Sequence, residues 1–84
     1  MNISFTSEAF EDYQNWSKED KKIFLKIGRF IKDIERTPYK GLGKPEPLKH
    51  DLSGYWSRRI TQEHRLVYKV KNDTIFIASC KYHY

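Results

Sequence analysis

Hydrophobic and polar residues recur along the chain with spacings that predict a short strand, two helices and then three strands. Residues 2–5, Asn-Ile-Ser-Phe, alternate as a strand does. We expect a first helix from Glu8 to about Trp16, with Ser7 as its N-cap. Its acidic first turn suits the positive end of the helix dipole.

The second helix has the clearest pattern in the sequence. Ser17 followed by Asp20 resembles a capping box and predicts that the helix restarts there after a bend. Apolar residues then repeat at i, i+4, i+7, i+8 and i+11, namely Ile23, Ile27, Phe30, Ile31 and Ile34. Thr37-Pro38 ends the helix, because proline disfavours helical backbone in the residue before it.

The second half of the chain predicts a loop followed by strands. Residues 39–54 hold three glycines and two prolines, which is typical of a loop with a defined shape. Strands are expected over 55–61, 64–70 and 74–82, with a turn at Asn72-Asp73. The fold class is therefore α+β: a single domain over 1–84, in which two N-terminal helices pack on one face of a small antiparallel β-sheet. The other face is left for solvent or a ligand.

The charge of the chain is localised. The 84 residues carry a formal net charge of +5. Residues 1–39 hold seven bases and seven acids, whereas residues 40–84 hold nine bases and four acids. The whole excess belongs to the C-terminal half, and such basic surfaces favour polyanions.

Several classes of protein are excluded by composition. No apolar run approaches the roughly 20 residues of a membrane span, and the first residues lack a signal-peptide pattern. The single cysteine, Cys80, excludes a disulfide framework and is expected to be packed in a strand rather than nucleophilic. We therefore expect a cytoplasmic protein with no membrane partner.

Basic residues on the predicted strands suit a phosphate backbone. Arg58 and Arg59 are adjacent and so point to opposite faces of a strand, Arg65 lies on the next strand, and Lys49 lies in the loop before them. A face that is merely solvated is the equally weighted alternative. Glu46, between two prolines in a basic loop, is suited to act as a general base on a 2′-hydroxyl. Taken alone, a carboxylate in that setting more often pairs with a neighbouring lysine.

His83 is the candidate general acid, since a histidine titrates near neutrality and can protonate a leaving oxygen. Its alternative is an ordinary exposed terminal histidine. His50 and His64 lack comparable neighbours in the sequence. His64 is expected to lie on a strand face, and His50, beside Asp51, to order the loop. A carboxylate, a histidine and guanidinium groups together suit RNA transphosphorylation without a metal or other cofactor.

Several long blocks of the sequence resemble one family of bacterial proteins. They read KPEPLKH from Lys44, LSGYWSRRI from Leu52, EHRLVY from Glu63 and the terminal YHY from Tyr82. In this order they are similar to the YoeB (Txe/YoeB) toxins of the RelE-like superfamily of type II toxin–antitoxin systems. The resemblance covers essentially the whole chain.

This resemblance implies a ribosome-dependent mRNA interferase that cuts mRNA in the decoding site and inhibits translation. By matching position, Glu46 is expected to be the general base and His83 the general acid, with Arg65 stabilising the transition-state phosphate. Lys49 and Arg59 would hold the substrate, and Tyr84 would help to position it. No cofactor is implied.

The resemblance also implies partners. These are mRNA on the small ribosomal subunit and a cognate YefM-like antitoxin with an acidic C-terminal segment; operator DNA would be bound only through the toxin–antitoxin complex. Two other functions remain open: a module that blocks the ribosome without cutting RNA, and a relative that inhibits DNA gyrase.

Overall fold

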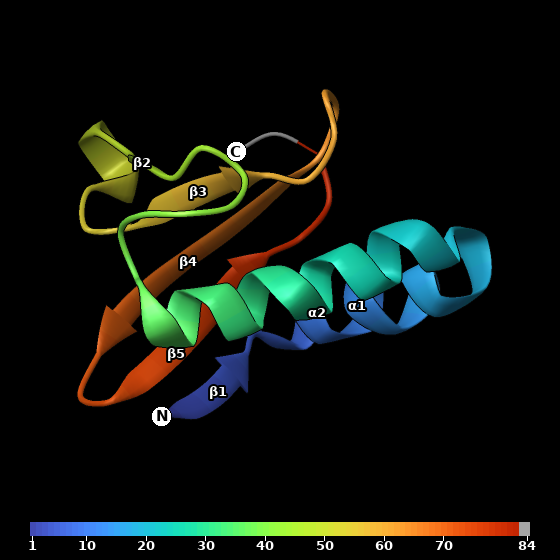
Figure 1. The fold of residues 1–84 in the computed structure, drawn as a ribbon, viewed down its shortest axis with the longest axis horizontal. Helices are drawn as coiled ribbons and strands as arrows, with labels where there is room; N and C mark the ends of the chain where they lie inside the picture. The colour runs from blue at the N-terminus through green and yellow to red at the C-terminus, as the bar shows by residue number, and fades with distance from the viewer. Residues whose placement is uncertain (83–84) are drawn as a thin grey trace.

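The computed structural model describes residues 1–82, in which two helices pack against a five-stranded sheet (Figure 1). The elements follow in the order β1 (Asn2–Phe5), α1 (Ser7–Glu19), α2 (Lys21–Arg36), β2 (Glu46–Pro47), a 3-10 turn η1 (His50–Leu52), β3 (Trp56–Arg59), β4 (Arg65–Lys71) and β5 (Thr74–Ser79). The α+β class is confirmed. The predicted loop differs, because it contains the two-residue strand β2 and the turn η1.

The strands lie in the order β1-β5-β4-β3-β2. All neighbouring pairs are antiparallel except β1 and β5, which run parallel with Ile3 opposite Ile75. The sheet is therefore mixed rather than wholly antiparallel. The alternation in residues 2–5 predicted a strand, but its direction depends on which strand it pairs with. That strand, β5, follows only after both helices and three other strands, and parallel neighbours cannot be joined by a tight hairpin.

The first helix, α1, ends at Glu19, and α2 begins at Lys21. The N-caps of both helices differ from those predicted. Thr6, not Ser7, caps α1: its Oγ1 accepts a hydrogen bond from Ala9 N at 3.1 Å. Ser17 lies inside α1, and Asp20 alone caps α2, with Oδ1 accepting from Lys22 N and Ile23 N at 3.1 and 3.3 Å. A carboxylate at this position satisfies amides that the first helical turn leaves without partners.

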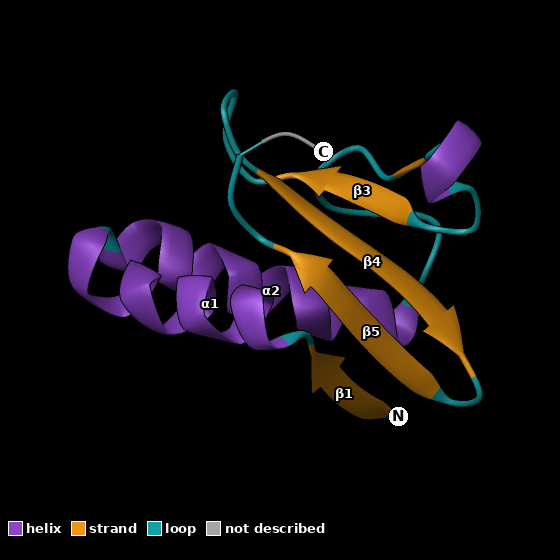
Figure 2. Cartoon of the chain, turned by 180° about the vertical axis from the view of Figure 1, so that it is seen from behind, coloured by secondary structure: helices purple, strands orange, loops and turns teal. Residues whose placement is uncertain are grey.

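The apolar residues predicted on α2 all lie in the core. Figure 2 shows the two helices together behind strands β4 and β5. They pack against the helix-facing side of the sheet, which carries Leu66, Tyr68, Ile75 and Ile77. Cys80 is fully buried below Trp16, whose Nε1 donates to Cys80 O at 3.0 Å. Burial raises the pKa of the Cys80 thiol to about 12, so it stays protonated at neutral pH, as expected for a packed cysteine.

Arg58 organises the chain between α2 and β2. Its guanidinium is completely buried and makes an ion pair with Asp33. It also donates to the carbonyl oxygens of Thr37, Lys40 and Leu42 at 2.7, 2.7 and 3.1 Å. A buried charge is tolerated only when it is paired and hydrogen-bonded, and here these partners fix the course of the loop.

Neither helix in the described part of the chain has the length and apolar character that a bilayer crossing requires.

Candidate active site

The register of β2, β3 and β4 brings polar side chains to the sheet face opposite the helices. Glu46 pairs with Ser57, and Arg59 pairs with Arg65. Ser57 and Arg59 are two residues apart on β3, so they and their cross-strand partners project from the same face. The intervening Arg58 projects into the core, which confirms that the two adjacent arginines point in opposite directions.

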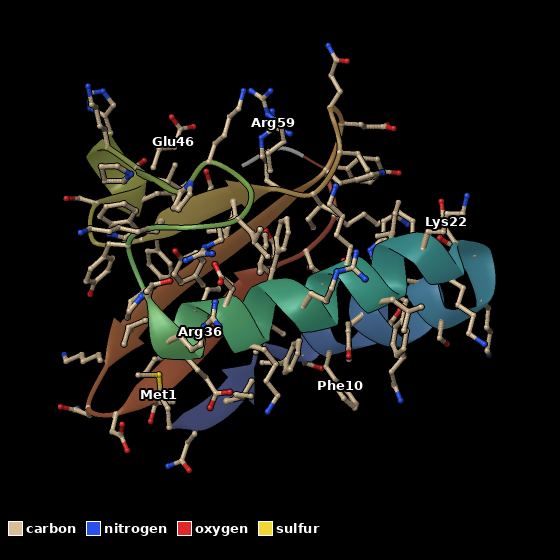
Figure 3. All side chains as sticks on the ribbon, viewed as in Figure 1. Met1, Phe10, Lys22, Arg36, Glu46 and Arg59 are labelled. Atoms are coloured by element: carbon tan, nitrogen blue, oxygen red, sulfur yellow. The ribbon has the colours of Figure 1, made fainter. Side chains whose placement is uncertain are left out.

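These four residues and Lys44 line a small cavity of about 90 Å³. Glu46 and Arg59 are exposed, whereas Ser57 and Arg65 are buried with 1% and 9% of their surface accessible. Figure 3 shows Glu46 and Arg59 on the same side of the sheet, away from the helices. One carboxylate and several cations therefore share an open pocket, the arrangement that acid–base chemistry on a phosphate requires.

The guanidinium of Arg65 is held in a fixed position by the turn between β3 and β4. Its Nη1 donates to the carbonyl oxygens of Thr61, Gln62 and His64, at 2.7, 3.1 and 3.2 Å. Hydrogen bonds of this kind, in which the donor is charged, are stronger than neutral ones. Arg65 is thus a preorganised cation at the wall of the cavity.

Glu46 is positioned by the paired backbone around it. Leu48 is buried, and its N–H donates to Tyr55 O at 2.9 Å. On the other side, Arg59 N donates to Gly43 O at 2.6 Å. These bonds fix both ends of the segment that carries Glu46. Because Lys44 lines the same cavity, pairing with a lysine stays open beside the catalytic role.

The other predicted site residues are not all brought into this cavity. Lys49 is exposed and lines an adjoining depression of about 410 Å³ that also includes Glu46. His83 and Tyr84 lie outside the described residues. Among residues 1–82, no group of three or more His, Cys, Asp or Glu side chains is arranged to hold a metal ion.

Sequence reasoning missed Ser57 and His64. Ser57 was overlooked because its hydroxyl is neutral, although its two-residue spacing from Arg59 already placed it on the same face. His64 was expected on a strand face, but it lies just before β4, where its Nδ1 accepts a hydrogen bond from Tyr82 N at 2.8 Å. That contact joins residues 18 positions apart, and no local pattern reveals it.

Comparison with known proteins identifies the family. Residues 5–84 match the family described as YoeB-like toxin of bacterial type II toxin–antitoxin system. The chain belongs to this family. The YoeB toxin of Escherichia coli K12 is 57% identical to this YoeB-like toxin over 84 residues, with both chains covered completely.

Solved structures agree with this assignment. A YoeB/ParE toxin from Agrobacterium tumefaciens superposes with a TM-score of 0.97 at 45% identity, with all of both chains covered. The structure of a YoeB–YefM complex from Staphylococcus aureus matches with a TM-score of 0.93 at 53% identity, covering 100% of this chain and 98% of that one. The RelE-like fold expected from the sequence is confirmed, and the chain is a toxin of a type II toxin–antitoxin system.

Proposed function

We propose that this YoeB-like toxin is a ribosome-dependent endoribonuclease that cuts mRNA in the decoding site and so inhibits translation. The observation that carries the proposal is the shared cavity of Glu46, Arg59 and Arg65. A surface that only binds RNA has no use for a carboxylate beside its cations. A transphosphorylating enzyme needs one to accept a proton.

In the proposed reaction the RNA supplies its own nucleophile. Glu46 takes the proton of a 2′-hydroxyl, and the 2′-oxygen attacks the adjacent phosphorus. The bond from phosphorus to the 5′-oxygen breaks, and His83 gives that oxygen a proton. The products are a 2′,3′-cyclic phosphate and a 5′-hydroxyl, so atoms and charges balance without a cofactor.

The cations stabilise the charge that develops on phosphorus. Arg65 is suited to this role because its guanidinium is held by three carbonyl oxygens before substrate arrives, so it needs no reorganisation during the reaction. Lys49 and Arg59 are exposed and suit binding of the flanking phosphates. Tyr84 is assigned to substrate positioning by resemblance to the family.

The proposed regulatory partner is a cognate YefM-like antitoxin. The S. aureus relative is described in a YoeB–YefM complex and in a heterotetrameric YoeB–YefM complex. The excess positive charge of residues 40–84 suits an acidic antitoxin segment that competes with RNA. Operator DNA would be bound through the antitoxin. With these partners, the proposed site of action is the cytoplasm, where translation occurs.

Primer extension on a translated message, with and without ribosomes, tests the proposal. The wild-type toxin should give discrete ends inside codons only when ribosomes are present. Glu46→Gln should lower the cleavage rate by about 10²–10⁴-fold, the usual contribution of a general base. Glu63→Gln is the matched control, because Glu63 is an exposed carboxylate in the turn between β3 and β4 and does not line the cavity.

Each alternative has a distinct result. Stalled but uncut message would indicate a ribosome-blocking module rather than a nuclease. DNA double-strand breaks without loss of mRNA would indicate a gyrase inhibitor. Equal cleavage by Glu46→Gln and Glu63→Gln would exclude Glu46 as the base.

A further inference from the structure

The chain beyond β5 is held to the start of β4 through the backbone of Tyr82. Tyr82 N donates to His64 Nδ1 at 2.8 Å, and Tyr82 O accepts from Arg65 N at 3.1 Å. Regular strand pairing in β5 ends at Ser79, so these bonds lie outside the sheet ladder proper. An imidazole nitrogen here accepts the N–H hydrogen bond that a backbone carbonyl oxygen accepts in regular strand pairing.

The backbone at Tyr82 requires such support. Its φ is +61°, in the left-handed region that a bulky residue enters only at a cost. Conformations of this kind persist where surrounding contacts over-determine them. More than half of the Tyr82 surface is exposed, so packing alone does not confine it. Its two backbone hydrogen bonds hold this conformation, and its ring also lies against the His64 ring, with centroids 5.4 Å apart.

His64 is itself rigidly placed. Only 9% of its side-chain surface is accessible, and its ring lies edge-on to Trp16 with centroids 4.8 Å apart. Its main chain is fixed by the turn that precedes β4, since His64 N donates to Thr61 Oγ1 at 3.0 Å. Accepting at Nδ1 leaves the ring hydrogen on Nε2, which lies 3.6 Å from Glu63 Oε1.

We infer that His64 is a positioning residue for the C-terminal segment: it locks the backbone of Tyr82 and thereby sets the point from which the chain continues into His83. The turn that holds His64 also holds the Arg65 guanidinium. One rigid turn therefore positions both Arg65, the proposed phosphate-stabilising cation, and Tyr82, from which the chain continues to the proposed acid. The effect on cleavage rests on the proposed function; the effect on Tyr82 does not.

The first test measures the full-length free toxin by NMR, without RNA or ribosomes. His64→Leu removes the acceptor and keeps an apolar side chain, and His64→Asn restores an acceptor because Asn Oδ1 occupies nearly the position of His Nδ1. We expect the Tyr82 amide to exchange about fivefold faster or more in His64→Leu and to recover in His64→Asn, as the loss of one hydrogen bond implies. Glu63→Gln, which changes only the neighbour of Nε2, should exchange like the wild type.

The inference is overturned if Tyr82 exchange in a folded His64→Leu toxin equals that of the wild type. It is also overturned if Glu63→Gln perturbs Tyr82 as strongly. Dispersed amide resonances and an unchanged Trp16 indole signal establish that each variant is folded. If His64→Leu does not fold, the comparison of His64→Asn and His64→Gln decides, because the longer glutamine moves the acceptor away from Tyr82 N.

The second test measures cleavage of ribosome-bound mRNA. His64→Leu should lower the maximal rate about five- to tenfold, leave the half-saturating ribosome concentration unchanged, and be partly rescued in His64→Asn. Full activity with a released Tyr82 would overturn the catalytic part of the inference. If the wild type does not cleave at all, the proposed function fails, whereas the NMR result still decides whether His64 holds the segment.

Discussion

Arg58 Nη1 donates to Asp33 Oδ2 at 2.6 Å, and both side chains are buried, with 0% and 8% of their surface accessible. This ion pair joins α2 to β3 beneath the site. Because Arg58 also holds the carbonyl oxygens of the following loop, the pair connects the helical core to the segment that carries Glu46. The geometry of the cavity therefore depends on a charge pair on the opposite face of the sheet.

Removing one partner of this pair should destabilise the fold strongly. Asp33→Ala leaves the Arg58 charge buried without its carboxylate, and we expect a loss of about 3–5 kcal/mol in the free energy of unfolding. Lys32→Ala is the control, because the Lys32–Glu35 pair has an 80% exposed lysine and is expected to contribute less than about 0.5 kcal/mol. Urea denaturation measures both. Similar losses in the two variants would contradict the structural role of Asp33.

Acid should weaken the same pair. The backbone N–H of Leu42 and the Arg58 guanidinium lower the pKa of Asp33 below its ordinary 3.8. A carboxyl whose pKa is lower in the folded state contributes its stability above the unfolded value and loses it as pH falls through the folded value. The stability difference between wild type and Asp33→Asn should therefore shrink as pH drops from about 5 to below 3.8. Urea midpoints across that range check this; a constant difference would refute it.

The elements of the fold were predictable where their pattern is local. Periodicity alone identified the buried face of α2, and alternation identified β3, β4 and β5. The direction of β1 was not predictable, because it depends on pairing with β5, the last strand of the chain. The N-cap of α2 was predicted wrongly: the capping-box pattern favours Ser17 as the cap, whereas Asp20 caps the helix. Both residue types are good N-caps, so the local sequence does not separate them.

The site was predictable to the extent that strand geometry determines it. The two-residue period separated Arg58 from Arg59, and the order of the strands brings Glu46, Arg59 and Arg65 together. The function of Arg58 as the anchor of the loop was not visible, since its partners come from distant parts of the chain. The contact between His64 and Tyr82 escaped prediction for the same reason.

Gly43 should be intolerant of a side chain. Its φ is +79°, and an added Cβ would lie 2.7 Å from Phe30 Cε2 and 3.0 Å from Arg58 Cβ. We expect Gly43→Ala to cost about 2–4 kcal/mol from backbone strain and overpacking. Gly54→Ala separates these effects: Gly54 also has a positive φ, +95°, but nothing lies within 4 Å of its added Cβ. Gly54→Ala should lower the free energy of unfolding by only about 1–2 kcal/mol, measured by thermal or urea unfolding. An equal loss in Gly43→Ala and Gly54→Ala would show that backbone strain alone, and not overpacking, sets the cost.

Arg65 and Arg59 should respond differently to replacement by lysine, although both line the cavity. Arg65 Nη1 is held by three carbonyl oxygens, and in Arg65→Lys an ammonium held by the same oxygens has no second nitrogen to present to a phosphate. We expect the maximal cleavage rate to fall by about a hundredfold, as for removal of a preorganised transition-state donor. Arg59 is exposed, and Arg59→Lys keeps its positive charge, so the cleavage rate should fall less than about fivefold. The loss should come mainly from weaker RNA binding and should grow as the salt concentration is raised. Single-turnover cleavage at saturating ribosomes separates the two effects. Equal losses in both variants would mean that the fixed position of Arg65 does not contribute to the reaction.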